Sequence, residues 1–341
     1  MMLTRRTLFG AGAALAAAPS ALAASDKIRL RLSTYLAPVS HSLVNIITPW
    51  MKALDRDSAG RLGFDLYTGG ALGRSPYAQF DLIRSGVADL GFAQPSYTTG
   101  QFKQLQILEV PFLTQNATEA SLVAWELCQR GLVQGFEGVK LLGLWTAEPG
   151  QLFTRVPFKT FADIKNLKIR SSGRLEGEFI QSLGASAEAM FPADVYEAMR
   201  RETIDGTVQG LVAAQTFQTY RVSTHVSTAP FGVVLFLMIM NRKTWDKLPA
   251  DIQDIITLNS GQRMALLGGT AYDKRVKEID AKYRANPALT YVEATPEDLE
   301  QLRAATKPLV EAWIARTANG AAVHEAALDI LKQLRQRERM S

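Results

Sequence analysis

Ile28-Arg29-Leu30-Arg31-Leu32-Ser33, together with Leu62-Gly63-Phe64-Asp65-Leu66-Tyr67 further along, decides the fold of this chain. Apolar residues occupy every second position of both segments, which is the period of a β-strand. Between them, apolar residues over 43–57 recur at helical spacing, and Ala59-Gly60 then favours the end of a helix. A strand, a helix and a strand in this order predict a β–α–β unit with parallel strands.

The same alternation continues along the chain. It predicts strands over 88–93, 139–145, 167–171 and 206–209, helices over 77–84, 119–134, 175–183 and 193–200, and C-terminal helices over 251–285, 296–318 and 323–337. Residues 229–240 carry no charge and are rich in Val, Phe and Ile, which favours a buried strand. We therefore expect an α/β fold with mainly parallel sheets. If the strand at 229–240 re-enters the first sheet, the domains are discontinuous and joined by a hinge.

Length and composition narrow the class of protein. The chain has 341 residues, whereas a single core stops growing at roughly 250–300, so two domains are expected. Hydrophobic residues make up 47% and charged residues 21%, which is typical of a globular protein and not of a disordered one. The single cysteine, Cys128, excludes an intramolecular disulfide and a clustered-thiol metal site, and its apolar neighbours at helical spacing indicate a buried thiol.

Residues 1–23 have the pattern of an export signal. Arg5 and Arg6 precede an apolar stretch and the small-residue site Ala21-Leu22-Ala23. Thr4-Arg5-Arg6 before two apolar residues is similar to a twin-arginine signal, but no lysine follows, so the general secretory route stays open. The stretch is too short to span a bilayer, and we expect a periplasmic protein without membrane insertion. Cleavage removes two arginines and lowers the net charge from +5 to +3, which argues against nucleic acid as a partner.

The common signatures of catalysis and of cofactor binding are absent from the sequence. It contains no G-x-S-x-G elbow, no P-loop and no H-E-x-x-H pair. His41, His225 and His324 are far apart, and none has a second ligand at metal-binding spacing. Glu176 and Glu178 fall on opposite faces of a predicted helix, which indicates a solvated surface. The sequence therefore predicts no enzyme, no metal and no cofactor.

Several short segments, in a fixed order, resemble the DctP-type solute-binding proteins of TRAP transporters. The resemblance spans roughly residues 28–285. The segments that carry it are Ser75-Pro76-Tyr77, Ile83-Arg84-Ser85-Gly86-Val87-Ala88-Asp89-Leu90-Gly91, Pro111-Phe112-Leu113, 160–170, Leu183-Gly184-Ala185, Met190-Phe191-Pro192, 195–199, Ile204-Asp205-Gly206 and 241–251.

The resemblance implies a two-lobed periplasmic binding protein of type II-like architecture, with discontinuous lobes joined by hinge strands and a long helix. We expect lobe I over 24–147 and 235–274, and lobe II over 148–234 and 275–341. The family implies that Arg170 fixes the substrate carboxylate. A guanidinium suits this role because its planar fork of donors matches a carboxylate and stays charged at any relevant pH.

Other family positions carry over less directly. Gln209 stands where some relatives place an asparagine that bonds the ligand, although a buried structural amide is an open alternative. Gln94 and Tyr35 follow strands, so they are candidates for the cleft as well as for structural roles. Gln151 is a further candidate, and Trp145 and Phe191 are candidates for an apolar pocket or for the core.

Gly150 is the informative departure from the family pattern. Sialic-acid-binding relatives have a second arginine at this position, and Arg174 and Arg155 are the candidates to compensate for its absence in this chain. The absence points to a monocarboxylate with an apolar or aromatic body.

The expected partners are this carboxylate and the membrane permease subunits of a TRAP transporter, with the receptor a monomer. A twin-arginine-exported periplasmic enzyme and a module that presents its ligand to a membrane sensor remain as alternatives.

Overall fold

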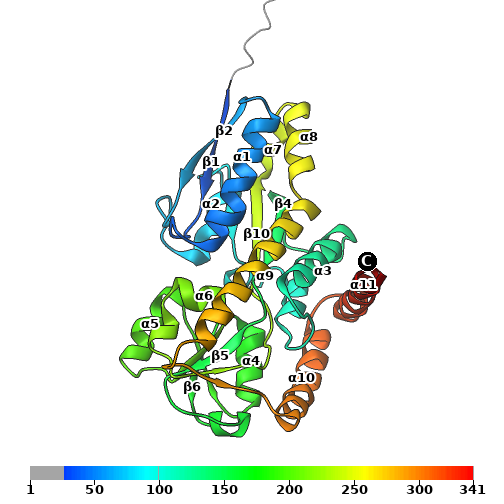
Figure 1. Cartoon of the computed structure of the whole chain (residues 1–341). Helices are drawn as coiled ribbons and strands as arrows, with labels where there is room; N and C mark the ends of the chain where they lie inside the picture. The colour runs from blue at the N-terminus through cyan, green and yellow to red at the C-terminus, as the bar shows by residue number, and fades with distance from the viewer. Residues whose placement is uncertain (1–26, 99, 341) are drawn as a thin grey trace, which may run out of the picture.

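The protein consists of two lobes, one above the other in Figure 1, each built around its own β-sheet. The structure is a computed structural model that describes residues 27–98 and 100–340, so the predicted export signal lies outside the described residues. Helices cover the faces of both sheets, as the alternating sequence pattern predicts. The two-lobed α/β architecture is thus confirmed.

The first lobe contains a five-stranded sheet. Its order is β2 (Leu62–Tyr67), β1 (Ile28–Ser33), β3 (Leu90–Ala93), β10 (Leu235–Asn241) and β4 (Val139–Thr146). The strands β2, β1 and β3 are parallel, whereas β10 runs antiparallel to both β3 and β4. The uncharged segment therefore does return to the first sheet as a buried strand, which makes this lobe discontinuous.

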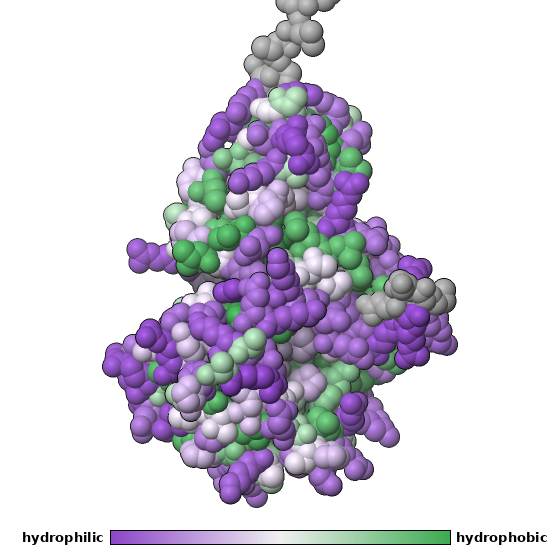
Figure 2. Space-filling model, in the orientation of Figure 1, coloured by the Kyte–Doolittle hydropathy of each residue, from purple (hydrophilic) through white to green (hydrophobic). Residues whose placement is uncertain are grey.

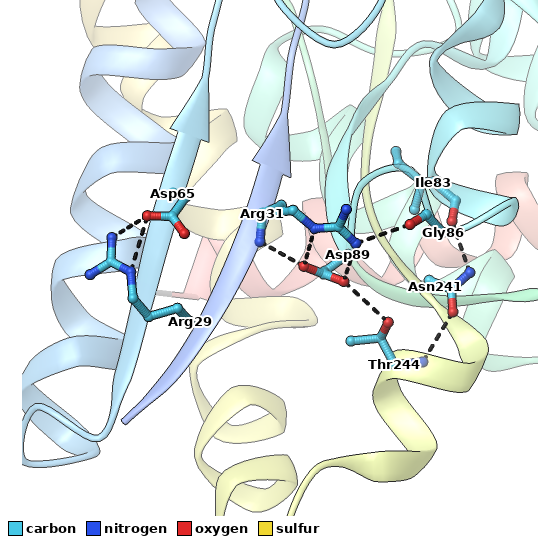
Figure 3. A network of polar contacts seen from close by, with 8 residues as sticks. All are labelled: Arg29, Arg31, Asp65, Ile83, Gly86, Asp89, Asn241 and Thr244. Atoms are coloured by element: carbon cyan, nitrogen blue, oxygen red, sulfur yellow. Dashed lines mark hydrogen bonds and ion pairs between the residues drawn. The ribbon is translucent and has the colours of Figure 1, made fainter. Parts of the chain in front are cut away.

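Polar contacts cross the first sheet from β2 and β1 to the end of β10 (Figure 3). Asp89 accepts hydrogen bonds from the backbone and the guanidinium of Arg31, at 2.8 and 3.0 Å. Burial opposes ionisation of Asp89, but these bonds prevail and hold its pKa below the ordinary value. Asn241, at the end of β10, caps the next helix by accepting from the Thr244 amide and donates to the carbonyl of Ile83. The returning strand is thereby tied to the first lobe.

The second lobe contains a six-stranded mixed sheet. Its order is β11 (Thr290–Val292), β9 (His225–Ser227), β5 (Gln151–Thr154), β8 (Gly206–Gln209), β6 (Lys168–Ser171) and β7 (Ser186–Ala189). The predicted strands correspond to β6 and β8, which are parallel, whereas the sequence did not predict the short strands β5, β7, β9 and β11.

Each lobe has its own set of helices packed on its sheet. The first lobe has α1 (Thr48–Asp57), α2 (Gln79–Arg84), α3 (Ala117–Gln129), α7 (Arg242–Lys247) and α8 (Ala250–Asn259), and the second has α4 (Arg174–Ser182), α5 (Pro192–Arg200) and α6 (Leu211–Thr216). The chain also forms helical turns that are not α-helical, namely η1 (Leu43–Ile47), η2 (Pro76–Ala78), η3 (Pro95–Tyr97), η4 (Lys103–Glu109), η5 (Phe161–Ile164) and η6 (Thr219–Arg221).

Two chain crossings and one long helix join the lobes. The crossing at 147–150 pairs with the crossing at 231–234, because the Ala147 amide donates to the Val234 carbonyl and the Gly150 amide to the Gly232 carbonyl. Helix α9 (Gln262–Arg284) runs across both lobes (Figure 1). The predicted hinge strands and long helix are therefore present.

The predicted helix over 251–285 is wrong in one respect, because it is two helices. Gly261 separates α8 from α9 with a φ of 61°, in the left-handed region that favours glycine. A Cβ at this position would also lie 2.7 Å from the Trp125 ring. The backbone conformation and the close approach of Trp125 thus both require a glycine at the break.

The two C-terminal helices bridge the lobes on one side of the molecule (Figure 1). Helix α10 (Pro296–Arg316) lies beside α4, and Arg316 pairs with Glu178 of that helix. Helix α11 (Gly320–Met340) instead packs on α3, where Arg335 binds Glu119. The sequence-based lobe boundaries stay a prediction, and α11 lies against the first lobe although it was assigned to the second.

The surface is mixed in character. On the face shown in Figure 2, hydrophilic residues dominate the lower lobe, whereas hydrophobic residues gather on the upper lobe just above the waist. None of the helices in the described part of the chain is both long and apolar enough to cross a bilayer.

Candidate functional site

A cavity of about 100 Å³ lies between the two lobes. A water molecule needs roughly 10–15 Å³ of such space, so the cavity has room for a small organic molecule. Strand ends from both sheets supply its polar side chains: Tyr35 and Gln94 follow β1 and β3, and Arg170 and Gln209 end β6 and β8. This is the edge at which α/β sheets bind ligands.

Arg170 is the only arginine among the residues that line this cavity, and it is 2% exposed. Its Nε donates to the Met190 carbonyl at 2.9 Å, and its Nη1 donates to the Val208 carbonyl at 3.2 Å. These bonds fix the plane of the guanidinium. The third nitrogen, Nη2, has no hydrogen-bond acceptor among the residues that the structure describes, so it remains available to an anion.

Gln209 ends β8, the strand next to β6 in the sheet, and is 4% exposed. Both polar atoms of its side chain, Oε1 and Nε2, are buried without a partner in the described structure. A buried amide without partners is costly, by about 1–3 kcal/mol for each group. Its position on the cavity wall therefore favours the ligand-binding interpretation over that of a structural amide.

Tyr35 and Gln94 form a polar chain on the first lobe's side of the cavity. The Tyr35 hydroxyl donates to Gln94 Oε1 at 3.1 Å, and Gln94 Nε2 donates to the Ser96 hydroxyl at 2.7 Å. Burial raises the pKa of Tyr35 well above its ordinary value, so the hydroxyl stays neutral. Both predicted residues line the cavity, and both also have structural partners.

Two buried carboxyl groups on the cavity wall were not among the sequence-based candidates. Glu148 is 4% exposed, and burial raises its pKa to about 7. Glu176 is 5% exposed and accepts from the Ser172 amide and hydroxyl. Burial raises the pKa of Glu176, and nearby Arg170 opposes that shift. The solvated-surface interpretation of Glu176 is therefore wrong, because its helix directs it inward against β6.

The rest of the cavity wall is largely apolar. The lining residues without an ionisable group include Leu36, Ala147, Pro192, Val212, Ala213, Phe217, Val234 and Phe236. Phe217 and Phe236 come from α6's end and from β10, segments that the sequence did not single out for the site. The combination of one arginine and an apolar wall suits an acid with a hydrophobic body.

Three predicted contacts do not line this cavity. Trp145 is fully buried in the core, where its ring packs 5.8 Å from Phe92 and its Nε1 donates to Ser42. Gln151 lines a separate surface pocket beside Pro149. Phe191 lies outside the wall, but its ring contacts Tyr97, which does line the cavity, at 5.3 Å.

Gly150 lines the cavity, and no arginine takes the place of the missing side chain. Arg174 is largely exposed and paired with Glu178. Arg155 binds Asp205 at 2.8 Å and is held by the carbonyl of Ile204. Neither guanidinium reaches the cavity wall, so Arg170 carries the positive charge of the site alone.

The described residues hold neither a clustered metal site nor an ionised thiol. Across residues 27–98 and 100–340, no three His, Cys, Asp or Glu side chains come together as a metal site would require. Burial raises the pKa of Cys128 to about 12, so its thiol stays protonated and unreactive.

Comparison with known proteins places the chain in a family. A family profile described as DctP, bacterial extracellular solute-binding protein, family 7, matches residues 32–317. The curated protein named outer membrane transporter protein TsaT, from Comamonas testosteroni, is 26% identical over 94% of this chain and 95% of its own length. A C4-dicarboxylate-binding periplasmic protein DctP from Vibrio cholerae is 26% identical over 70% of this chain and 73% of its own length.

Solved structures share the fold. A TRAP solute-binding protein from Rhodoferax ferrireducens, in complex with copurified benzoate, gives a TM-score of 0.83 at 24% identity, covering 92% of this chain and 100% of that one. A TRAP solute-binding protein from Bordetella bronchiseptica, with bound (R)- and (S)-mandelate, gives a TM-score of 0.81 at 25% identity, covering 90% of this chain and 99% of that one. A third structure, from a marine metagenome, is described as specific for aromatic acid ligands and holds 3-hydroxybenzoate. Its TM-score is 0.84 at 23% identity, covering 91% of this chain and 99% of that one. The chain therefore belongs to the DctP family of TRAP-transporter solute-binding proteins.

Proposed function

We propose that this protein captures an aromatic monocarboxylate in the periplasm and delivers it to the membrane permease subunits of a TRAP transporter. The observation that carries this proposal is Arg170, a buried arginine on the wall of a largely apolar cavity. Its Nη2 has no hydrogen-bond acceptor among the described residues. A carboxylate would accept hydrogen bonds there from a charged donor in a site that excludes water, which strengthens the interaction. The apolar wall would cover the body of the ligand.

The single carboxylate follows from the charges around the cavity. A second carboxylate would meet no second guanidinium, because Gly150 offers no side chain and Arg155 and Arg174 are paired elsewhere. It would instead approach Glu148 or Glu176, both buried and acidic. Dicarboxylates and the sialic acids are therefore disfavoured by charge and not by size alone.

The aromatic body is supported by the relatives whose structures hold benzoate, 3-hydroxybenzoate or mandelate. In this chain Phe217 and Phe236 lie on the cavity wall, where such a body would meet them. Offset or edge-on contacts between aromatic rings add about 0.5–1.5 kcal/mol to the burial of their area.

Delivery to a permease would depend on closure of the lobes. The hinge at 147–150 and 231–234 allows the two lobes to move about the cavity, and ligand that contacts both would shift the population to the closed state. We propose that the monomer in this closed state is what the permease recognises.

Isothermal titration calorimetry with a panel of acids tests the ligand class. We expect benzoate, phenylacetate or mandelate to bind at least about tenfold more tightly than succinate, malate or sialic acid, a difference of roughly 1.4 kcal/mol. Benzamide, which has the same ring but no charge, serves as the control and is expected to bind far more weakly. Tight binding of sialic acid or a C4-dicarboxylate, with none of an aromatic acid, would contradict the proposal.

A further inference from the structure

The hinge side of the cavity holds a polar site distinct from Arg170. Glu148 lies on the crossing segment that follows β4, and Gln209 ends β8. The Glu148 carboxyl lies close to the end of this strand, because a Cβ built on Gly210, the residue after Gln209, would clash with Glu148 Oε1. Only a glycine at 210 therefore lets the Glu148 carboxyl lie against the end of this strand.

The Glu148 carboxyl has one oxygen that is satisfied and one that is not. Its Oε1 accepts a hydrogen bond from the Val212 amide at 2.8 Å, which fixes the orientation of the group. Its Oε2 is buried and has no partner in the described part of the chain, and Glu148 as a whole is 4% exposed. Both polar atoms of Gln209 are also unpartnered, so these two lining residues give the cavity three buried polar atoms without a partner in the described structure.

An unsatisfied carboxyl oxygen in a ligand cavity needs a hydrogen-bond partner from the ligand or from water. An aliphatic or purely aromatic body offers none, and a second carboxylate would repel the ionised group. Burial raises the pKa of Glu148 to about 7, and the nearby charge of Asp273 acts in the same direction. Near this pKa the Glu148 carboxyl is found both protonated and ionised, so the ligand group must pair with either form. A hydroxyl does so, because it can donate to the ionised carboxylate and accept from the protonated carboxyl.

We propose that Glu148, assisted by Gln209, binds a hydroxyl group of the ligand and makes the receptor selective for hydroxylated aromatic monocarboxylates. This inference rests on the proposed function, since it names a second group on the same ligand. The carboxylate binds at Arg170, and the hydroxyl binds at the hinge. Because Glu148 stands on the crossing segment and bonds to the second lobe, the ligand hydroxyl would also contact the segment that moves on closure.

Calorimetry with benzoate and its 2-, 3- and 4-hydroxy derivatives tests the selectivity. We expect at least one isomer to bind about tenfold or more tightly than benzoate, as a hydrogen bond to a charged group allows. The matching fluorobenzoate, which is similar in size but has no hydroxyl donor, is expected to bind no better than benzoate. A fluoro derivative that gains as much as the hydroxy derivative would overturn the proposal, because the gain would then come from packing.

Two variants separate Glu148 from the rest of the site. Glu148→Met removes both oxygens, and we expect the ratio of benzoate to hydroxybenzoate dissociation constants to fall to about one. Glu148→Gln keeps an acceptor for the Val212 amide and protects the fold, and we expect its ratio to fall at least about threefold as a charged acceptor is replaced. Glu202→Gln, an exposed carboxylate away from the cavity, is the control.

The outcomes distinguish the two proposals. If the wild-type protein binds no aromatic acid, the proposed function fails. If it binds benzoate as tightly as every hydroxybenzoate, or if both Glu148 variants keep the wild-type ratio, only the hydroxyl assignment fails, and ordered water satisfies Glu148 instead.

Discussion

The two lobes contribute different chemistry to the cavity between them. The second lobe supplies the charged side chains Arg170 and Glu176, both nearly fully buried. The first lobe supplies neutral groups such as Tyr35, Gln94 and Phe236, and its one titratable base, His41, has a pKa lowered by burial and by Arg275. The difference indicates that the second lobe anchors the carboxylate and that the first lobe covers the ligand.

Direct contacts between the lobes support this division. The Phe191 ring, from the second lobe, packs 4.7 Å from Tyr77 and 5.3 Å from Tyr97 of the first. These are contacts between aromatic side chains, without ion pairs, so they can form and break as the lobes close and open. Substitutions in the second lobe should therefore change ligand affinity most, and substitutions in the first should act through closure.

Arg170→Gln is expected to have the largest effect. Loss of the only guanidinium on the cavity wall should weaken binding of an aromatic carboxylate by about 30-fold or more, since breaking a buried charged pair costs about 2–5 kcal/mol. Calorimetry measures the change. Arg174→Gln, four residues along and paired with Glu178 outside the cavity, is the matched control, with affinity within about twofold of wild type. A loss of less than about tenfold for Arg170→Gln would show that the second lobe is not the anchor.

Glu109→Gln tests the boundary between the lobes through the pH dependence of stability. Glu109 ends η4 and lies against Gly173, the N-cap of α4, and burial together with the charge of Glu176 raises its pKa to about 8, from an ordinary 4.5. Between these values the folded chain keeps the proton and the unfolded chain loses it. Stability should therefore fall as pH rises through this window, by at most about 1.4 kcal/mol per pH unit.

Urea denaturation at pH 5 to 8 measures this slope. We expect the Glu109→Gln variant to lose part of the decline, whereas Glu137→Gln, at an exposed position, should follow the wild type. Equal slopes in all three proteins would mean that Glu109 is ionised in the folded state.

Phe191→Ala should have an intermediate effect that arises from closure. Each aromatic pair is worth about 0.5–1.5 kcal/mol, so we expect ligand affinity to fall by about 3- to 10-fold. Small-angle scattering of the ligand-bound variant should show a larger radius of gyration than the wild type, because fewer molecules are closed. Tyr196→Ala, on the same helix α5, is the control. Unchanged affinity and an unchanged radius of gyration would show that the Phe191 contact does not stabilise the closed state.

Tyr35→Phe should have the smallest effect. The Tyr35 hydroxyl is already bonded to Gln94, so its removal should change carboxylate affinity by less than about threefold. A loss of more than about tenfold in the same calorimetric assay would mean that this hydroxyl binds the carboxylate directly. The first lobe would then anchor the ligand as well, and the division between the lobes would be incorrect.

Sequence reasoning found the residues whose position follows from strand periodicity. Arg170 and Gln209 end regular strands, and Tyr35 and Gln94 follow them, so the cavity edge could be predicted from local pattern together with family resemblance. The ends of these strands lie at the same edge of each sheet because β1 and β3 are parallel, as are β6 and β8. This arrangement is a property of the fold class.

Other residues could not be placed in this way. Glu148 lies on an irregular crossing segment, and its burial depends on the absence of a side chain at Gly210. Trp145 ends a strand as well, but its ring turns into the core because Phe92 and Phe236 pack against it. A large aromatic residue near a site has the same local signal in either place, and only tertiary packing decides between them.

A crystal structure of the protein with bound 3-hydroxybenzoate tests the central claim most directly. We predict that the ligand carboxylate lies within about 3 Å of Arg170 Nη2, that the ring lies against Phe236, and that the first lobe contacts the ligand only through neutral groups. A carboxylate bound instead to Tyr35 and Gln94, more than about 4 Å from the guanidinium, would contradict the assignment of the second lobe as the anchor.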